Sequence, residues 1–425
     1  MSKPRVLITG TGAVCAAGMD TDAIMAKVRA GETLIGPIEG FDATGWPHAR
    51  AAEMRDFNAR ALVDDRKLHK FIRRTDFFGI YAGDRAVASA GFNAHRDTLP
   101  PERAAQYNDG TGAYVGSGGG SFQDQYDYFP LMTETGGDLH RFGEELGNVV
   151  NPMWLLRSLP NNVLCHVGIR NMLKGSNACI TNHSCGGTLA VIEAAEALRQ
   201  GEADRAVAIG HDTPIEPQNV LYYGRCGLLA SETLRPFDVA HDGSVMGEGA
   251  GALALETEAS VRERGGRVVG EVLGGGEAAE AAGLLAIRDD GDGVERAVRA
   301  ALADAGLAPG DVGMIVAHGN GTPLSDSSEA AALLRVFGGA MPPVTAFKWS
   351  FGHLIAAAGI LETVLALAAL RERVVPGIAT LRELDPACAG LRVSARAQEP
   401  RSDIALIVCR GFAGTNAALL VRSLA

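Results

Sequence analysis

The sequence lacks the features that mark several large classes of protein. No apolar run reaches the ~18–20 residues of a membrane span. The N-terminal MSKPRVLITG has no long apolar segment of a secretory signal, and strand-like sequence begins at once. Lys and Arg number 39 against 50 Asp and Glu, a net charge of −11 at pH 7. This acidic balance argues against nucleic acid as the main partner, because phosphate binding needs a basic surface.

Cysteine is sparse and irregularly placed. The seven cysteines are an odd number and include no CxxC pair, so neither a zinc site nor a disulfide framework is indicated. No nucleotide or flavin motif is visible. We therefore expect a cytoplasmic protein with reduced thiols, no membrane segment, no metal and no bound cofactor.

What the chain does contain is typical of a globular α/β protein. At 425 residues it is too long for one ordinary core, so we expect two domains or two fused halves. Short apolar strand-like segments alternate with helix-like ones, as at 189–199, 294–305 and 329–337; strand-like segments lie at 5–12, 113–118, 178–181, 205–210, 252–256, 313–317, 344–347 and 404–409. A charged stretch near 256–265 places the boundary between halves at 1–258 and 259–425.

The stretch NHSCGG at 182–187 raises the question of a nucleophile. It lies between a strand and a helix, so Ser184 and Cys185 occupy a turn that exposes side chains near the helix N-terminus. Gly186 and Gly187 would let a substrate approach the backbone. His183 is adjacent, but neighbours along a strand point to opposite faces, so we expect a structural histidine rather than a base. A Ser N-cap would also explain Ser184 without chemistry.

Two further histidines lie beside glycines at strand ends. His318 follows an apolar run in VAHGNGT, and His353 lies in FKWSFGHLIAAAGILE, five residues after Lys348. Neither has a metal-ligand spacing. Loops at strand ends commonly carry catalytic groups.

Basic residues are concentrated at 64–74, where six of eleven residues are Lys, Arg or His. This segment is either a solvated helix face or a docking surface for an acidic partner.

Taken together, five stretches resemble the β-ketoacyl-[acyl carrier protein] synthases, the condensing enzymes of the thiolase superfamily, over roughly residues 3–422. They are GSNACITNHSCGG, RPFDVAHDGSVMGEGAGALALE, VAHGNGTPLSDSSEA with Asp326 and Glu329, KWSFGHLIAAAGILE, and GFAGTN at 411–416. The resemblance implies two fused βαβαβαββ halves in five layers, usually dimeric. It also implies decarboxylative condensation of malonyl- and acyl-carrier protein, with phosphopantetheine supplied by the carrier.

The resemblance also implies roles for individual residues. His318 and His353 would stabilise enolate and thioester oxygens, and Lys348 would orient them with support from Glu362. Asn320 and Thr322 would contact the pantetheine arm, and Arg410 and Phe412 would form the gate and oxyanion loop. Carrier protein would dock on the basic residues, which are Lys70, Arg73 and Arg74.

Counting residues decides the alignment at the turn. The family cysteine lies nine residues after the glycine of its GPN motif and seventeen before that of GDAD. Counted from Gly175 and back from Gly201, both spacings end on Ser184. Cys185 is one residue late, which rotates its side chain by about 100° on a helix. A hydroxyl is the weaker nucleophile and needs a base.

Three other positions depart from the family pattern. Arg410 replaces the aromatic gate residue, His241 an arginine and Asn320 a threonine. The guanidinium of Arg410 suits a carboxylate, so it is a candidate clamp for a malonyl group or an acidic starter, or else a surface or interface arginine.

Four interpretations follow. The chain is a partner subunit like a type II polyketide chain-length factor, paired with a cysteine-bearing ketosynthase. Alternatively it is an enzyme that acylates Ser184 or only decarboxylates malonyl groups. It could also be an ordinary homodimeric synthase in which Cys185 acts or a native cysteine has been replaced. The last is a non-catalytic scaffold for carrier protein. Retention of His318, His353 and Lys348 favours an enzyme-like site.

Overall fold

The computed structural model describes residues 4–119 and 128–424. Its main sheet has ten strands in the order β11-β10-β12-β13-β9-β1-β8-β6-β4-β5. The N-terminal five are β1 (Val6–Cys15), β4 (Thr111–Ser117), β5 (Asn177–Ile180), β6 (Arg205–Asp212) and β8 (Gly249–Thr257). The C-terminal five are β9 (Gly270–Ala279), β10 (Met314–Val316), β11 (Val344–Thr345), β12 (Ile404–Gly411) and β13 (Thr415–Ser423).

The two sets of five strands repeat one topology. In each set the spatial order is third, second, fourth, fifth and first along the chain, with two parallel pairs followed by two antiparallel ones. A short antiparallel pairing of Val6–Ile8 with Gly270–Val272 joins the sets. The fold is thus a structural duplication that no sequence repeat revealed.

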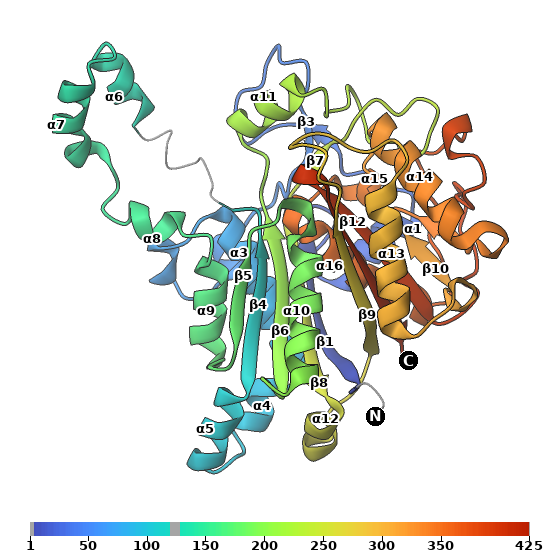
Figure 1. Cartoon of the computed structure of the whole chain (residues 1–425). Coiled ribbons are helices and arrows are strands. Elements are labelled where there is room, and N and C mark those ends of the chain that lie inside the picture. Colours follow the sequence, from blue (N-terminus) through green and yellow to red (C-terminus); the bar gives the residue numbers. More distant parts are fainter. Residues whose placement is uncertain (1–3, 120–127, 425) are drawn as a thin grey trace.

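Helices form three layers around these strands (Figure 1). The middle layer is α10 (Gly186–Gln200) and α16 (Ala358–Arg371), which contact each other and strands of both halves. On the far side of the N-terminal strands pack α3 (Arg74–Ala90) and α9 (Asn162–Asn171). Over the C-terminal strands packs α13 (Asp292–Ala305), and α14 (Pro323–Phe337) packs against α13. Together with the two strand layers this is the five-layer thiolase-like α/β fold.

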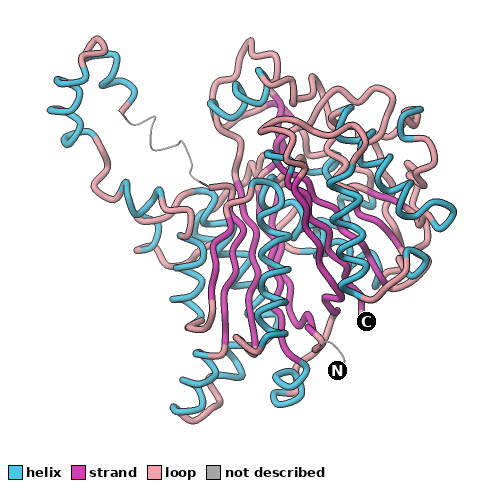
Figure 2. The backbone as a smooth tube through the Cα atoms, viewed as in Figure 1, coloured by secondary structure: helices cyan, strands magenta, loops and turns pink. Residues whose placement is uncertain are grey.

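The remaining helices and strands are short, and two of the helices, α11 and α15, carry residues of the site described below. The helices are α1 (Thr21–Arg29), α2 (Ala59–Leu62), α4 (Phe92–Arg96), α5 (Pro101–Asp109), α6 (Phe129–Glu134), α7 (Leu139–Val149), α8 (Trp154–Ser158), α11 (Pro217–Arg225), α12 (Glu258–Arg264) and α15 (Lys348–Phe351). A three-stranded sheet joins β2 (Gly36–Pro37), β3 (Arg50–Ala52) and β7 (Met246–Gly247). Figure 2 shows α6 and α7 projecting from the body.

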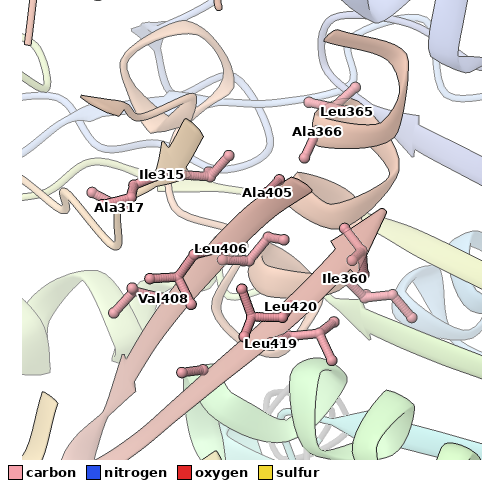
Figure 3. Packing of buried hydrophobic residues seen from close by; sticks show 14 of the residues in the cluster. Ile315, Ala317, Ile360, Leu365, Ala366, Ala405, Leu406, Val408, Leu419 and Leu420 are labelled. Atoms are coloured by element: carbon pink, nitrogen blue, oxygen red, sulfur yellow. The ribbon is translucent and has the colours of Figure 1, made fainter. Parts of the chain in front are cut away.

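Helix α16 has no solvent-exposed face. Every residue from Ala358 to Leu370 is buried, as expected of a helix that is apolar all round. Figure 3 shows Ile360, Leu365 and Ala366 of this helix near residues of β12 and β13. The helix that carries Glu362 is therefore fixed between the two halves.

In the part of the chain that the structure describes, no helix is both long and apolar enough to cross a membrane.

Candidate active site

The site lies where several strands end. His183 and Ser184 follow β5, Tyr223 follows β6 on α11, His318 follows β10, and Phe412 follows β12. All five line one pocket of about 720 Å³, which includes its open mouth. Catalytic groups commonly gather at the carboxyl ends of strands in α/β sheets.

Ser184 is the residue of the NHSCGG turn that reaches this pocket. It is 1% exposed, in the short 3-10 turn His183–Cys185 directly before α10. Its Oγ lies 3.2 Å from Nε2 of His353 and 2.9 Å from Nδ1 of His183. The start of a helix favours a developing negative charge, so the position suits a nucleophile or an oxyanion.

Cys185 lies away from the pocket, although we also named it as a candidate nucleophile. It is fully buried, and its Sγ faces the carbonyl oxygens of Cys409 and Thr415, each at 3.5 Å. Burial raises the pKa of this thiol well above its usual value. Because Cys185 is one residue further along the chain, its thiol points into the core. It is therefore not positioned to attack a thioester bound in the pocket.

The role expected for the two glycines was wrong. A Cβ on Gly187 would stand 2.5 Å from the carbonyl oxygen of Ala356, and one on Gly186 would lie 3.4 Å from Cα of Gly116. Their missing side chains let α10 pack against neighbouring backbone. They do not open a path for substrate.

His318 and His353 face each other across the pocket, with ring centroids 5.1 Å apart. Burial first, and then the Lys348 ammonium, hold the pKa of both imidazoles well below the usual value. Nδ1 of His318 accepts the Arg410 N–H, and Nδ1 of His353 accepts the Ile355 N–H, both at 3.3 Å. A neutral ring whose Nδ1 accepts carries its proton on Nε2, so both histidines are N–H donors.

The backbone fixes His353 on both sides. Its N–H donates to Val245 at 2.7 Å, and its carbonyl accepts the Gly247 N–H at 3.0 Å. Gly352 precedes it at φ +74°, where a Cβ would stand 2.7 Å from the Met246 carbonyl oxygen. The loop can approach β7 this closely only with glycine at 352.

Lys348 acts through a fully buried ion pair. Its Nζ donates to Glu362 Oε1 at 2.7 Å and to the His318 carbonyl oxygen at 2.6 Å. Both side chains are 0% exposed. Lys348 therefore positions the His318 loop and adds positive charge behind the two imidazoles.

The acids of the VAHGNGTPLSDSSEA stretch hold the backbone of that loop. Glu329 accepts the N–H groups of His318 and Gly319 at 2.7 and 3.0 Å, and burial raises its pKa to about 7. Asp326 accepts the Gly321 N–H and pairs with His241. Although burial lowers the pKa of His241, the carboxylates of Asp326 and Asp385 raise it overall.

Asn320 and Thr322 line the pocket, and the resemblance implies that they contact the pantetheine arm. The Asn320 Oδ1 accepts both the N–H and the hydroxyl of Thr322, at 3.1 and 2.9 Å. Asn320 and Thr322 are therefore held to each other in the pocket wall.

The expectation that Arg410 acts as a free carboxylate clamp was wrong. The side chain is 5% exposed, and its guanidinium pairs with Glu280 at 2.8 Å. It also donates to Asn416, to Ser328 Oγ and to the Ser325 carbonyl oxygen. The charge is already neutralised inside the protein, and the backbone of Arg410 is the part that serves the site.

We predict that Arg410→Met destabilises the protein by about 3–5 kcal/mol, because it leaves Glu280 buried without its partner. Urea unfolding measures the loss, and the exposed Arg396→Met is the matched control. An unchanged unfolding midpoint combined with a raised KM for malonyl-carrier protein would instead support the hypothesis that Arg410 binds the malonyl carboxylate.

The expected docking residues are only partly on the surface. Lys70 is exposed, but Arg73 is 4% exposed and donates to Ser158 Oγ at 2.6 Å. Arg74 pairs with Glu248 and covers the ring of Phe57. The basic cluster therefore includes two residues that hold the start of α3 to its surroundings.

The expected orientation of His183, away from Ser184, was wrong because His183 does not lie on a strand. The strand ends at Ile180, and His183 has φ +41°, which turns its ring toward Ser184. Tyr223, Glu280 and the segment Leu284–Ile287 also contribute to the pocket, and no sequence motif indicated them. They come from separate loops that only the fold brings together.

A hydroxyl beside a helix N-terminus and two imidazole N–H donors in one pocket, on a duplicated five-layer scaffold, define the class of thiolase-fold acyl-transfer proteins. Family models confirm that the chain belongs to the β-ketoacyl synthase family: the Beta-ketoacyl synthase, N-terminal domain matches residues 3–260 and the Beta-ketoacyl synthase, C-terminal domain matches residues 269–382. Its class is thus that of 3-oxoacyl-acyl carrier protein synthase-type acyltransferases, which serve fatty acid or polyketide biosynthesis.

Individual relatives match over nearly the whole chain. The 3-oxoacyl-[acyl-carrier-protein] synthase 2 of Coxiella burnetii is 29% identical over 99% of each chain. Nodulation protein E of Rhizobium meliloti is 32% identical over 98% of each. Among solved structures, the ishigamide ketosynthase/chain length factor has a TM-score of 0.87, 28% identity and 100% coverage of both chains. A Beta-ketoacyl synthase from Burkholderia phymatum STM815 has a TM-score of 0.87 and 26% identity over 99% of this chain and 100% of that one.

Proposed function

We propose that the protein accepts an acyl group from carrier-protein phosphopantetheine as an ester on Ser184 and condenses it with a malonyl group. The observation that carries this proposal is the 3.2 Å approach of Ser184 Oγ to Nε2 of His353 inside a pocket shared with His318. His318 and His353 donate to the thioester oxygen of malonyl-carrier protein. CO₂ leaves, and the enolate carbon attacks the acyl carbon of the Ser184 ester. The bond from that carbon to Ser184 Oγ breaks, Oγ takes up a proton from solvent, and β-ketoacyl-carrier protein is released.

Carrier protein as the partner is supported by the relatives' name and by the exposed part of the basic segment. Arg66, Lys67 and Lys70 are exposed beside α3. The Coxiella relative is named for its action on acyl carrier protein. An acidic carrier would be attracted to these three charges.

A dimer is supported by the projecting helices. Large apolar side chains are exposed along α6 to α8 and the following turn, among them Leu139, Trp154, Leu155 and Leu156. Apolar patches of this kind commonly mark protein interfaces. We propose that the segment packs against a second subunit, either another copy of this chain or a cysteine-bearing ketosynthase.

A second candidate function is that of a non-condensing partner subunit. Serine in the nucleophile turn favours it, and so does the similarity to a structure titled as a ketosynthase/chain length factor. Two neutral imidazole donors in one pocket argue for the enzyme, because a non-catalytic subunit has no need of them. The buried Lys348–Glu362 ion pair, which holds the His318 loop in place, argues the same way.

Incubation with acyl-carrier protein and malonyl-carrier protein tests the proposal. We expect β-ketoacyl-carrier protein from the purified protein alone, detected by mass spectrometry, and no condensation product from Ser184→Ala. Product that appears only after a cysteine-bearing ketosynthase is added would support the partner subunit.

We also propose that the two halves meet at residues 258 and 259, which the repeated strand order on either side supports. The cytoplasmic location and the absence of a bound cofactor or metal stay predictions.

A further inference from the structure

We propose that His183 is the general base that activates Ser184, with Tyr223 as the residue that positions it. The inference rests on the proposed function, because it explains how a hydroxyl can take the acyl group. In a synthase with cysteine in the turn, the thiol ionises readily and needs little help. Serine needs a group that removes its proton during attack.

The distances place His183 in the correct position. Its Nδ1 lies 2.9 Å from Ser184 Oγ, within the reach expected of a base. Its Nε2 lies 2.7 Å from the Tyr223 hydroxyl. The imidazole also stacks on the ring of Phe412, with ring centroids 4.2 Å apart. The stacking fixes the plane of the imidazole, and the contacts of its two nitrogens fix its rotation within that plane.

The hydrogen-bond network assigns the protons consistently. The Phe412 N–H points at Nδ1 of His183 from 3.5 Å, so Nδ1 is an acceptor and Nε2 donates to Tyr223. His353 carries its proton on Nε2 and donates to Ser184 Oγ. The hydroxyl proton of Ser184 is then left for His183 Nδ1. Burial lowers the pKa of His183 to about 4, so the imidazole is neutral at pH 7 and its Nδ1 carries no proton. The same burial makes it a weaker base than a free imidazole, so the assignment rests on the distances.

The backbone supports a functional placement. His183 has φ +41°, a left-handed conformation that costs a non-glycine residue about 1–3 kcal/mol. Such strain is concentrated at active sites. An extended residue at 183 would turn the imidazole away from Ser184.

The step balances. Ser184 Oγ bonds to the acyl carbon as its proton passes to His183 Nδ1, and the carbonyl oxygen becomes an oxyanion. When the carbon–sulfur bond breaks, the proton on His183 passes to the departing phosphopantetheine thiolate. The products are the Ser184 ester and free carrier thiol, with His183 neutral again.

Acylation rates in two backgrounds test the assignment. His183→Asn keeps an acceptor oxygen beside Ser184 but cannot take the proton. We expect about 10²–10³-fold slower acylation of Ser184 by acyl-carrier protein, measured by intact mass. In a Ser184→Cys background we expect the same substitution to cost less than about tenfold, because the thiol ionises without a base. Tyr223→Phe should slow acylation of Ser184 by about tenfold through loss of orientation.

The outcomes separate the two proposals. Wild-type protein that is never acylated overturns the Ser184 ester and the base together. Wild-type acylation with an unchanged rate in His183→Asn overturns the base alone. Equal losses in the serine and cysteine backgrounds also overturn it, because they indicate a structural role. His166→Asn, a half-buried histidine on α9, is the matched control, and circular dichroism checks the folding of each variant.

Discussion

Replacing His318 or His353 by alanine lowers the rate of CO₂ release from malonyl-carrier protein by about 10²–10³-fold, the usual loss when one donor to a developing oxyanion is removed. Both imidazoles are neutral and hold their N–H groups toward one pocket, so each loss removes a donor that cannot be replaced by water without reorganisation. Release of labelled CO₂ measures the effect.

The control for this prediction is His95→Ala on α4, a half-buried histidine that does not line the pocket. It should leave the rate unchanged. If either pocket histidine could be removed with more than about a third of the activity left, that histidine would not be an oxyanion donor.

Lys348→Met destabilises the protein by about 3–5 kcal/mol, because Glu362 is then left as an unpaired charge in the core. Burial raises the pKa of Glu362 while the Lys348 ammonium opposes that rise, so removing the ammonium forces the carboxyl group either to ionise in the core or to take up a proton. Urea unfolding followed by circular dichroism measures the change.

A matched surface pair provides the comparison. Lys174 and Asp109 lie 2.6 Å apart with 54% and 60% of their side chains exposed. Lys174→Met should therefore cost no more than about 1 kcal/mol. The double change Lys348→Met and Glu362→Leu should recover part of the loss, since no buried charge remains. A double variant no more stable than Lys348→Met would show that the loss comes from packing and not from the charge.

The sequence predicted the fold class and most elements because their signals are local. Short apolar runs predicted β1, β6 and β12, and helix-like segments at 189–199 and 294–305 predicted α10 and α13 close to their observed bounds. The duplication stayed hidden because it is a repeat of strand order and not of residues. Helix α14 begins at Pro323, six residues before the expected start, since Pro is well suited to the first turn of a helix.

The site was predictable where a motif carries it and not where the tertiary structure decides. His318, His353 and Lys348 were named from their stretches, and the residue count indicated Ser184 as the pocket-facing member of the turn. Arg410 was misread because its buried partner, Glu280, lies 130 residues away. The orientation of His183 was mispredicted because a strand was assumed where the backbone turns to φ +41°.

The most direct test of acylation at Ser184 is to identify the residue that carries the acyl group. The protein is incubated with acyl-carrier protein, digested, and the adduct located by peptide mapping, with Cys185→Ala and Ser184→Ala as paired variants. We expect an acyl group on Ser184 that is still present in Cys185→Ala and is lost in Ser184→Ala. An acyl group on Cys185, or an adduct that survives Ser184→Ala, would contradict it.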